Sequence, residues 1–417
     1  MMRVLEGVVR PYAWGSRTAI ASLRGRPVPS PHPEAELWFG AHQAAPALCL
    51  HPDGAPDTDL LTAIDADRAA MLGSRITDAF GGRLPFLLKV LAAEEPLSLQ
   101  AHPSAEQARE GFERENALGL PLDAADRNYR DPWHKPELIV ALTEFDALAG
   151  FRDPVVTVEL MRELQVSELD PYLGMLAGQP DSEGLRALFT TWLTLPDASI
   201  SALVPAVLTG AVNLLSSGDP RFVPVLQTVL ELGEIYPRDP GVLASLLLNR
   251  ICLQPGEALF LSAGNLHAYL HGTGVEIMAN SDNVLRGGLT PKHIDVPELL
   301  RVLDFTPVDV AELTPAIRTV GAERIYLTPA PEFRLSRVEL DGTGLRDPSS
   351  ICFDMPGPQI LAVLGGAIEV RPAGGRAVTI PAGQAIWIGD DEPDVVVHAG
   401  SSRAVFVRAL VPFGAGG

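Results

Sequence analysis

The segment QPGEALFLSAGNLHA, residues 254–268, has a layout that recurs near the end of the chain. It runs from a Pro-Gly turn through a polar side chain and an apolar strand to a turn of small residues. Residues 380–394, IPAGQAIWIGDDEPD, follow the same order. When the two turn glycines are aligned, Asp394 falls opposite His267, so the second copy lacks the histidine. We therefore expect two related β units, of which the first carries the working site and the second is structural.

Short strands separated by glycine turns are typical of a small double-sheet jelly roll, the cupin fold or double-stranded β-helix. Residues 1–102 are interpreted as mostly short strands, whereas residues 154–249 carry the apolar spacing of helices. We predict a mainly β protein with a helical insertion. Its parts are a discontinuous catalytic cupin domain at 1–153 and 250–329, an inserted α-helical domain at 154–249, and a second, degenerate cupin barrel at 330–417.

Two further helices are predicted from the residues at which they begin. In SAEQAREGFERENALG, Ser104 is a candidate N-cap, and Gln107 completes a capping box with it. In DVPELLRVLDF, Asp295 is the candidate N-cap and Pro297 lies in the first turn.

The composition limits the class of partner. The 417 residues include 32 Lys and Arg against 52 Asp and Glu, and the resulting charge of −20 disfavours nucleic acid and anionic membranes. A phosphorylated substrate would need a local basic pocket. No signal-peptide pattern is present and no run approaches about 18 apolar residues, so a cytoplasmic protein without a membrane span is expected. Three distant cysteines in apolar strand-like segments are expected to be buried free thiols: Cys49, Cys252 and Cys352.

The segment PLSLQAHPSAEQA, residues 96–108, alternates apolar and polar residues before it stops at Pro103. Side chains two apart on a strand point to the same face, so Ser98, Gln100 and His102 share one face. If that face is buried, the glutamine and histidine need partners. They are either surface residues or two ligands directed into a cavity.

Two other segments contain candidate ligands. In DPWHKPELIV, Lys135 and Glu137 share a face at the start of an apolar strand, and a simple ion pair between them is an equally good interpretation. His267 follows a Gly-Asn turn, and an isolated histidine there is more often an ordinary core or surface residue. Taken together, Gln100, His102, Glu137 and His267 supply imidazole, amide and carboxylate groups that suit a borderline divalent metal such as Zn²⁺. One open coordination position would make such a site catalytic.

Several blocks make the chain similar to type I mannose-6-phosphate isomerases, also called phosphomannose isomerases, of the cupin superfamily. The blocks fall in the expected order over residues 12 to about 305 and include ELWFGAH, LPFLLKVLAAEEPLSLQAHP, DPWHKPEL, GNLHAY and SDNVLRGGLTPK. The last 110 residues match only as a degenerate cupin. The resemblance implies one zinc ion per chain, bound by the same four residues. It further implies that Arg286 is catalytic, that Lys135 and Glu276 line the pocket, and that Lys89, Ser98 and Lys292 lie at the sugar-phosphate end.

The implied reaction interconverts mannose 6-phosphate and fructose 6-phosphate through an enediol. A fixed guanidinium stabilises enediolate charge without losing a proton, which is the role we assign to Arg286. Its alternative is a surface salt bridge with Asp282. The general base is either Glu276, tuned by burial, or Lys135, and we prefer Glu276 with Lys135 assisting the O1/O2 protons or ring opening.

Two other classes of function remain open from the residues. One is an Fe²⁺-dependent cupin oxygenase, although such sites usually contain more histidines. The other is a sugar-phosphate sensor that has kept the fold without turnover. The expected partner in either isomerase or sensor is a small sugar phosphate, and a monomer is expected with an oligomer left open.

Overall fold

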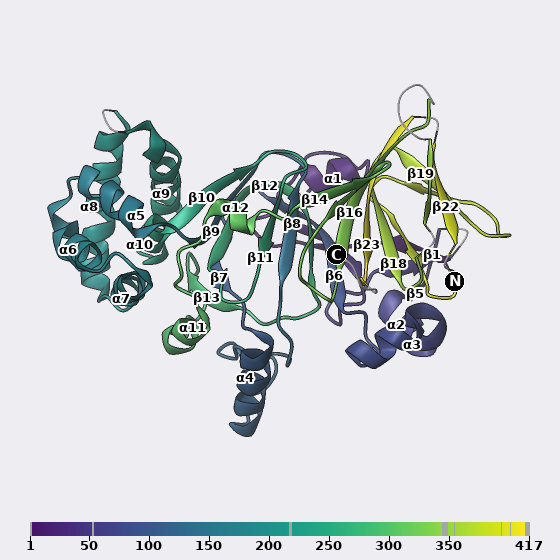
Figure 1. Cartoon of the computed structure of the whole chain (residues 1–417), viewed down its shortest axis with the longest axis horizontal. Helices are drawn as coiled ribbons and strands as arrows, with labels where there is room; N and C mark the ends of the chain where they lie inside the picture. Colours follow the sequence, from purple (N-terminus) through teal and green to yellow (C-terminus); the bar gives the residue numbers. More distant parts are fainter. Residues whose placement is uncertain are drawn as a thin grey trace.

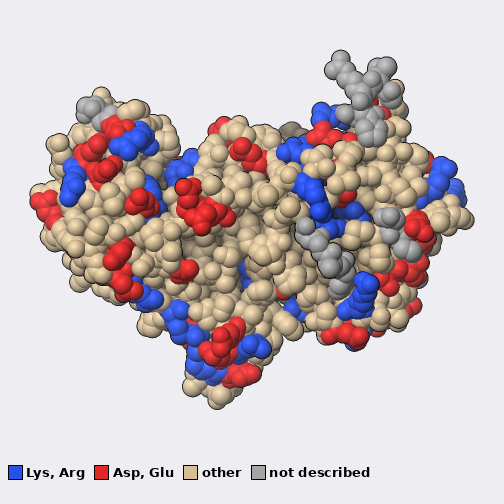
Figure 2. Space-filling view, viewed as in Figure 1, with Lys and Arg blue, Asp and Glu red and all other residues tan. Residues whose placement is uncertain are grey.

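The computed structural model describes residues 2–51, 54–216, 219–343, 349–353, 355–392, 394–400 and 402–412. Three regions follow one another along the long axis of the molecule (Figure 1): a helical region, a β-rich middle region and a second β region. On the face drawn in Figure 2, acidic and basic side chains lie interspersed, and neither sign covers a continuous area of the described surface. The protein is thus β-rich with a helical region, as predicted.

The middle region is built on a ten-stranded sheet with the main order β10-β9-β12-β6-β3-β2, and β7, β8, β11 and β13 pair beside this path. Its strands are β2 Val8–Arg10, β3 Glu36–Gly40, β6 Phe86–Ala93, β7 Leu99–Ala101, β8 Glu137–Ala141, β9 Phe145–Phe151, β10 Leu248–Leu253, β11 Ala258–Leu261, β12 His267–Ala279 and β13 Leu285–Gly288. Segments far apart in sequence therefore meet in one sheet.

Strand β12 is the longest of these and brings most of the predicted site residues together. Its first residues pair with β7 and β9, so that His267 lies opposite Gln100. Its last residues pair with β6 and β8, so that Glu276 lies opposite Lys89. Gly272 has a φ of +117° between the two halves, and a Cβ there would come within 2.5 Å of a backbone oxygen. Glycine thus permits the change of partners in mid-strand.

The helical region extends from 154 to 247. It comprises α5 Pro154–Glu163, η1 Ser167–Leu169, α6 Asp170–Gly178, α7 Ser182–Leu193, α8 Asp197–Leu215, η2 Pro220–Phe222, α9 Val223–Ile235, α10 Gly241–Ala244 and η3 Ser245–Leu247. Its apolar core is continuous with residues of β7, β12 and β13, including Leu99 and Leu285. By length and composition alone α8 could cross a membrane. It packs against α9, however, and several of its residues are buried in this core, as expected of a core helix in a folded domain.

The second β region contains a nine-stranded sheet, β14-β15-β16-β23-β18-β21-β1-β4-β5, and a four-stranded sheet, β17-β22-β19-β20. The strands are β1 Met2–Glu6, β4 Leu48–Leu50, β5 Pro56–Asp59, β14 Ile317–Val320, β15 Glu323–Tyr326, β16 Arg334–Asp341, β17 Ser350–Phe353, β18 Gln359–Gly365, β19 Ala367–Pro372, β20 Val378–Pro381, β21 Ala385–Ile388, β22 Val395–Ala399 and β23 Arg403–Leu410. The N-terminal strand β1, which we expected in the first β region, instead pairs with β21. Nothing local in its five residues specifies that partner.

The remaining helices show where local signals were sufficient. They are α1 Ala19–Leu23, α2 Leu60–Ala66, α3 Arg68–Phe80, α4 Ala105–Ala117, α11 Val296–Val302 and α12 Val310–Leu313. The Ser104–Gln107 capping box begins α4 and Asp295 caps α11, as predicted. The expectation of mostly strands before residue 102 missed the helices α1, α2 and α3. The starts of α2 and α3 are capped by Asp59 and Asp67, whose side chains accept from backbone amides.

The expectation for the cysteines was correct for one of the three. Cys49 is buried, whereas Cys252 and Cys352 are exposed. Both exposed residues lie on strands, β10 and β17, where alternate side chains face outward. An apolar neighbourhood in sequence therefore did not indicate which face the thiol takes.

Candidate metal centre and its cavity

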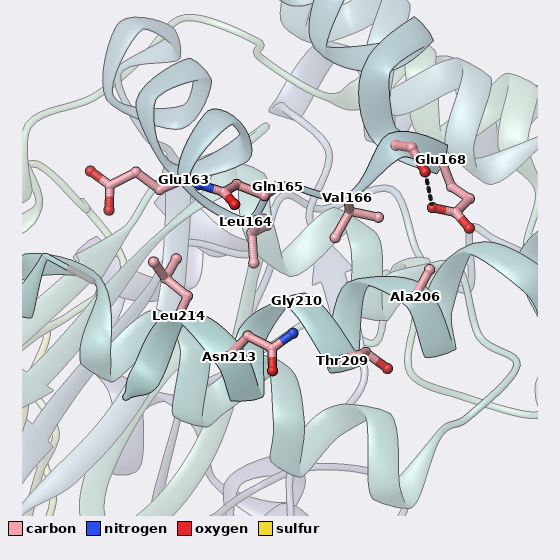
Figure 3. A pocket seen from close by; sticks show the side chains of 11 residues that line it. Glu163, Leu164, Gln165, Val166, Glu168, Ala206, Thr209, Gly210, Asn213 and Leu214 are labelled. Carbon is pink, nitrogen blue, oxygen red and sulfur yellow. Dashed lines mark hydrogen bonds between the residues drawn. The ribbon is translucent and has the colours of Figure 1, made fainter. Parts of the chain in front are cut away.

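Two cavities differ in the charge of their walls. One, of about 560 Å³, lies in the helical region between the α5–η1 segment and α8 (Figure 3), and its lining contains Glu163 and Glu168 but no Lys or Arg among the described residues. The other, of about 620 Å³, opens in the middle β region. Eight of the ten predicted site residues line it: Lys89, Ser98, Gln100, Lys135, Glu137, Glu276, Arg286 and Lys292. Of these two cavities, the second has the chemistry of a sugar-phosphate site.

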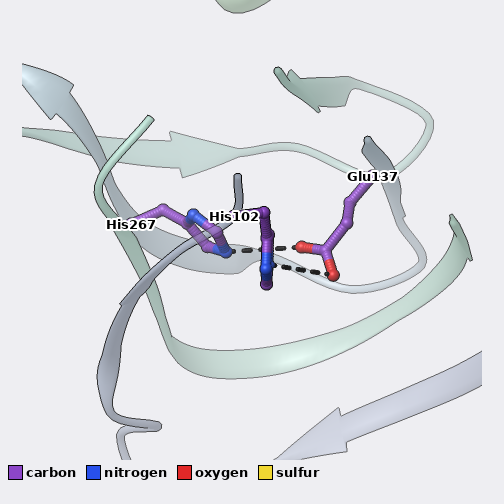
Figure 4. A group of neighbouring side chains, drawn as sticks. All are labelled: His102, Glu137 and His267. Atoms are coloured by element: carbon purple, nitrogen blue, oxygen red, sulfur yellow. Dashed lines mark ion pairs between the residues drawn. The ribbon is translucent and has the colours of Figure 1, made fainter. Parts of the chain in front are cut away.

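Three side chains converge on one point at the wall of this cavity (Figure 4). His102 Nε2 lies 3.3 Å from Glu137 Oε1, and His267 Nε2 lies 3.3 Å from Glu137 Oε2. One ligand atom from each residue falls within 4.8 Å of the others, and all three side chains are at most 2% exposed. The predicted ligands from three separate strands and turns therefore meet.

The hydrogen bonds of the two histidines leave both Nε2 atoms available to bind a metal. His102 Nδ1 bonds to the backbone oxygen of Asn283 at 2.8 Å, and His267 Nδ1 bonds to that of Asn265 at 3.0 Å. A carbonyl oxygen can only accept, so each Nδ1 carries the proton and each Nε2 presents a lone pair. Both Nε2 atoms and Glu137 Oε2 are buried without a hydrogen-bond partner in the described structure. Such orphaned donor atoms fit a bound cation.

The electrostatics of His102 and Glu137 favour protonation states that suit a metal. Burial lowers the pKa of His102 to about 4, so its imidazole is neutral at pH 7. Burial opposes ionisation of Glu137, but its neighbours, among them the charged Lys135, outweigh it and hold its pKa well below the usual range. Lys135 Nζ is 3.4 Å from Glu137 Oε1, so the ion pair considered as an alternative is also present. Neutral imidazoles and an ionised carboxylate are the forms that bind Zn²⁺.

Gln100 is half-buried and lines the cavity from β7, next to His267 on β12 and to Arg286 on β13. Its position is compatible with a fourth ligand, which stays a prediction. A second group of possible ligand atoms, Glu144, Asp146 and Cys252, is partly or fully exposed. There Asp146 already pairs with Arg250 at 2.7 Å, so the buried group is the better metal centre.

A buried acid–base network forms a second part of the cavity. Lys89 Nζ lies 2.5 Å from Glu276 Oε2 and 3.2 Å from Glu36 Oε1. Tyr269 donates its hydroxyl to Glu276 Oε1 at 2.8 Å. Burial raises the pKa of Glu276 even though Lys89 opposes that rise. Burial also opposes the charge of Lys89, but Glu276 and Glu36 outweigh it and raise the pKa of the ammonium. Glu36 was missed because its partner Lys89 lies on another strand, whereas Tyr269 was missed although its partner Glu276 lies on the same strand, β12.

Three cations form a third part of the cavity. Arg286, Lys292 and Arg130 line it, and their side chains make no hydrogen bond or ion pair with any described residue. Burial, followed by the charge of Arg130, lowers the pKa of Arg286. Burial and the charges of both arginines lower the pKa of Lys292. The alternative salt bridge of Arg286 is not formed, because Asp282 pairs instead with His42 at 3.3 Å. A group of uncompensated cations favours an anionic ligand.

Arg130 was missed by the sequence argument although it stands beside the DPWHKPEL block. A stronger signal lay in the choice between Lys and Arg. Of the 32 basic residues only three are lysines, and all three line this cavity: Lys89, Lys135 and Lys292. The other basic residues of the chain are arginines, so this cavity is marked by the rarer cation.

Asn283 links the metal centre to the cation group and was also missed. The residue is fully buried. Its Oδ1 accepts from the backbone amide of Arg130 at 2.8 Å, and its Nδ2 donates to the backbone oxygens of Asp131 and Trp133, both at 2.8 Å. Its own carbonyl orients His102. One amide side chain thus fixes the segment that carries Arg130 and leads to Lys135.

Comparison with known proteins agrees with this geometry. The sequence profile for the catalytic domain of type I phosphomannose isomerase matches residues 2–154. The mannose-6-phosphate isomerase of Salmonella typhimurium is 41% identical over 394 residues, covering 94% of this chain and 96% of that protein. The chain belongs to the type I phosphomannose isomerase family.

Other members of the family extend the agreement. The mannose-6-phosphate isomerase of Escherichia coli is 40% identical, covering 89% of this chain and 93% of that protein, and the human protein is 33% identical with 93% of each covered. A crystal structure of a mannose 6-phosphate isomerase bound with zinc and yttrium superposes with a TM-score of 0.87. It is 37% identical and covers 99% of this chain and all of that one. A zinc-bound structure of a mannose 6-phosphate isomerase matches with the same score.

Proposed function

We propose that the protein interconverts D-mannose 6-phosphate and D-fructose 6-phosphate through an enediol, as a zinc-dependent aldose–ketose isomerase. The observation that carries this proposal is the meeting of His102 and His267 with Glu137, which lines a cavity that also holds the buried carboxylate of Glu276 and three cations without a hydrogen bond or ion pair among the described residues. Each of these parts serves one requirement of the reaction. The family membership of the chain supports the same substrate.

His102, Glu137 and His267 would hold the zinc ion, with Gln100 as the proposed fourth ligand. A bound zinc ion supplies Lewis acidity that polarises the sugar oxygens. The orphaned nitrogens and carboxylate oxygen described above fit this group, since no other described side chain satisfies them.

Glu276 is the proposed base that takes the proton from C2 and returns it to C1. Burial raises the pKa of Glu276 toward neutral pH, and a pKa nearer to the working pH favours both uptake and release of the proton. Lys89 and Tyr269 hold the two carboxylate oxygens in place. Lys135, next to Glu137, is proposed to assist ring opening and the O1/O2 protons.

Arg286 is proposed to stabilise the negative charge of the enediolate. Its guanidinium remains charged and faces the cavity without a protein partner in the described structure, so it is available to a developing oxyanion. Lys292, Ser98 and Arg130 are proposed to bind the phosphate. Lys89 stays a predicted phosphate residue, although its bonds to Glu36 and Glu276 favour a role in supporting the base.

The two β regions are proposed to be cupin barrels, the first catalytic and the second degenerate. We keep the division into 1–153 with 250–329, 154–249 and 330–417, and add that β1, β4, β5, β14 and β15 lie in the nine-stranded sheet of the last part. We further propose that the protein acts in the cytoplasm as a monomer on a small sugar phosphate.

A coupled assay from mannose 6-phosphate through fructose 6-phosphate to glucose 6-phosphate tests the function in zinc-loaded protein. We expect turnover with mannose 6-phosphate and far less with unphosphorylated mannose. Binding without turnover would support the sensor, and substrate-dependent oxygen uptake by the iron-loaded protein would support the oxygenase. Either result would overturn the isomerase proposal.

A further inference from the structure

The loop that follows β13 carries the proposed phosphate ligand Lys292, and its backbone is strained. Gly288 has a φ of +135° and Leu289 a φ of +56°. A non-glycine residue in the left-handed region is unfavourable and persists only where its surroundings hold it. Leu289 is buried in the apolar core shared with the helical region. The conformation of this loop therefore depends on what packs against it.

What packs against it is the turn between α9 and α10 of the helical region. Asp239 accepts from the backbone amide of Thr290 at 3.0 Å through Oδ2. Its other oxygen, Oδ1, accepts from the amide of Gly241 at 2.7 Å. One carboxylate thus joins the start of α10 to the loop two residues before Lys292. Because the acceptor is charged, these hydrogen bonds are stronger than neutral ones.

The two backbones also approach too closely for side chains. A Cβ on Gly241 would lie 2.7 Å from the amide nitrogen of Leu289, and a Cβ on Gly288 would lie 2.6 Å from Gly241 Cα. Real Cβ atoms do not approach so closely, so glycine is required on both sides of the contact. The helical region and the loop are therefore fitted to each other.

The same turn reaches the other proposed phosphate segment. Tyr236, which lines the cavity, donates its hydroxyl to the backbone oxygen of Pro96 at 3.3 Å. Pro96 lies two residues before Ser98. Residues 236–241 of the helical region thus touch two of the three segments that carry proposed phosphate ligands, those of Ser98 and Lys292.

From these contacts we propose that Asp239 is a positioning residue for phosphate binding, and that the helical insertion completes the active site by holding the Gly288–Lys292 loop. This proposal rests on the proposed function, because it names the means by which that site holds its substrate phosphate. Asp239 does not touch the substrate and acts through Thr290 and Lys292.

The full-length zinc-loaded protein offers a clean test because it contains only three lysines. Labelling with ¹⁵N-lysine gives three backbone amide signals, and the Lys292→Arg variant identifies that of Lys292 by its loss. In the wild type, inorganic phosphate should shift this signal. In Asp239→Ala we expect the Lys292 signal to move before phosphate is added, with those of Lys89 and Lys135 unchanged. We expect the phosphate affinity measured by calorimetry to fall by about tenfold and the KM for mannose 6-phosphate to rise by a similar factor, with kcat reduced much less.

Asp181→Ala is the matched control. Asp181 likewise accepts from two backbone amides in the helical region, at the start of α7, and it does not line the cavity. It should change melting temperature without changing phosphate affinity. If the alanine variant does not fold, Asp239→Asn is used for the same test. Its side chain keeps one acceptor oxygen and therefore disturbs the structure less.

Unchanged Lys292 signal and phosphate affinity in folded Asp239 variants would overturn the positioning role, as would an equal loss in the Asp181 control. The spectroscopic and calorimetric readouts need no turnover. A wild-type protein that binds phosphate but does not isomerise mannose 6-phosphate would therefore end the proposed function while leaving this test intact.

Discussion

Glu276 and Lys89 lie opposite each other on β12 and β6, and their charged atoms are 2.5 Å apart inside the cavity. Lys89 also forms an ion pair with a second buried carboxylate, Glu36, so its positive charge is shared between two acids. Glu276 is also held by Tyr269, so both of its carboxylate oxygens have a partner. This relationship makes the base and its support separately testable.

Replacing Glu276 with Gln should lower kcat by about 10²–10⁴-fold, the usual contribution of a positioned base. Glu36→Gln is the matched control, since it removes the other carboxylate from Lys89 and should cost far less turnover. Steady-state kinetics at saturating mannose 6-phosphate give both values. Near-full activity of Glu276→Gln would rule out its role as base.

The pH dependence should change when Lys89 is replaced by Met. The base must be ionised, so kcat/KM rises as pH passes upward through the pKa of Glu276. Lys89 lowers that pKa against the effect of burial, and its removal should move the acid limb to higher pH. Lys292→Met removes a lysine that does not contact Glu276 and should raise KM with the limb unmoved. An acid limb of kcat/KM at the same pH in both variants would contradict the effect of Lys89 on the pKa of Glu276.

Replacing Arg286 with Lys keeps the charge but removes the planar fork. We expect kcat to fall by about 10²–10³-fold, the range found when a donor to a developing oxyanion is lost. Metal content and melting temperature should stay near the wild-type values, which separates chemistry from folding. An active Arg286→Lys protein would show that charge alone is sufficient.

Arg130→Ala should raise the KM for mannose 6-phosphate by about tenfold with a smaller effect on kcat, because a cation proposed to bind the phosphate is removed. Arg221→Ala is a suitable control, since Arg221 is exposed and pairs with Asp219 and Glu159 in the helical region. If both variants have the wild-type KM, Arg130 does not bind the phosphate.

The sequence was informative where chemistry is local and was less so where partners are distant. Alternation along β7 correctly placed Ser98 and Gln100 on one face toward the cavity, and capping residues placed α4 and α11. Spacing alone could not show that His102 and His267 meet Glu137, since strand pairing over more than a hundred residues brings them together. The family resemblance supplied that step.

The errors and omissions have the same physical origin. Strand β1 pairs with β4 and also with β21 near the other end of the chain, and nothing within β1 specifies the distant partner. Asn283 and Asp239 act through backbone atoms of other segments, so their residue type gives no signal of their role. Cys252 is exposed because strand alternation places its side chain outward, which the surrounding apolar residues conceal.

Zinc titration of chelator-treated protein, followed by direct NMR observation of fructose 6-phosphate formed from mannose 6-phosphate, tests the metal-dependent isomerase most directly. We expect no product without metal, a rise in rate with added Zn²⁺ that ends at one ion per chain, and loss of that binding step in Glu137→Gln. Turnover that persists without metal, or metal-loaded protein that forms no fructose 6-phosphate, would contradict the proposed site and its reaction.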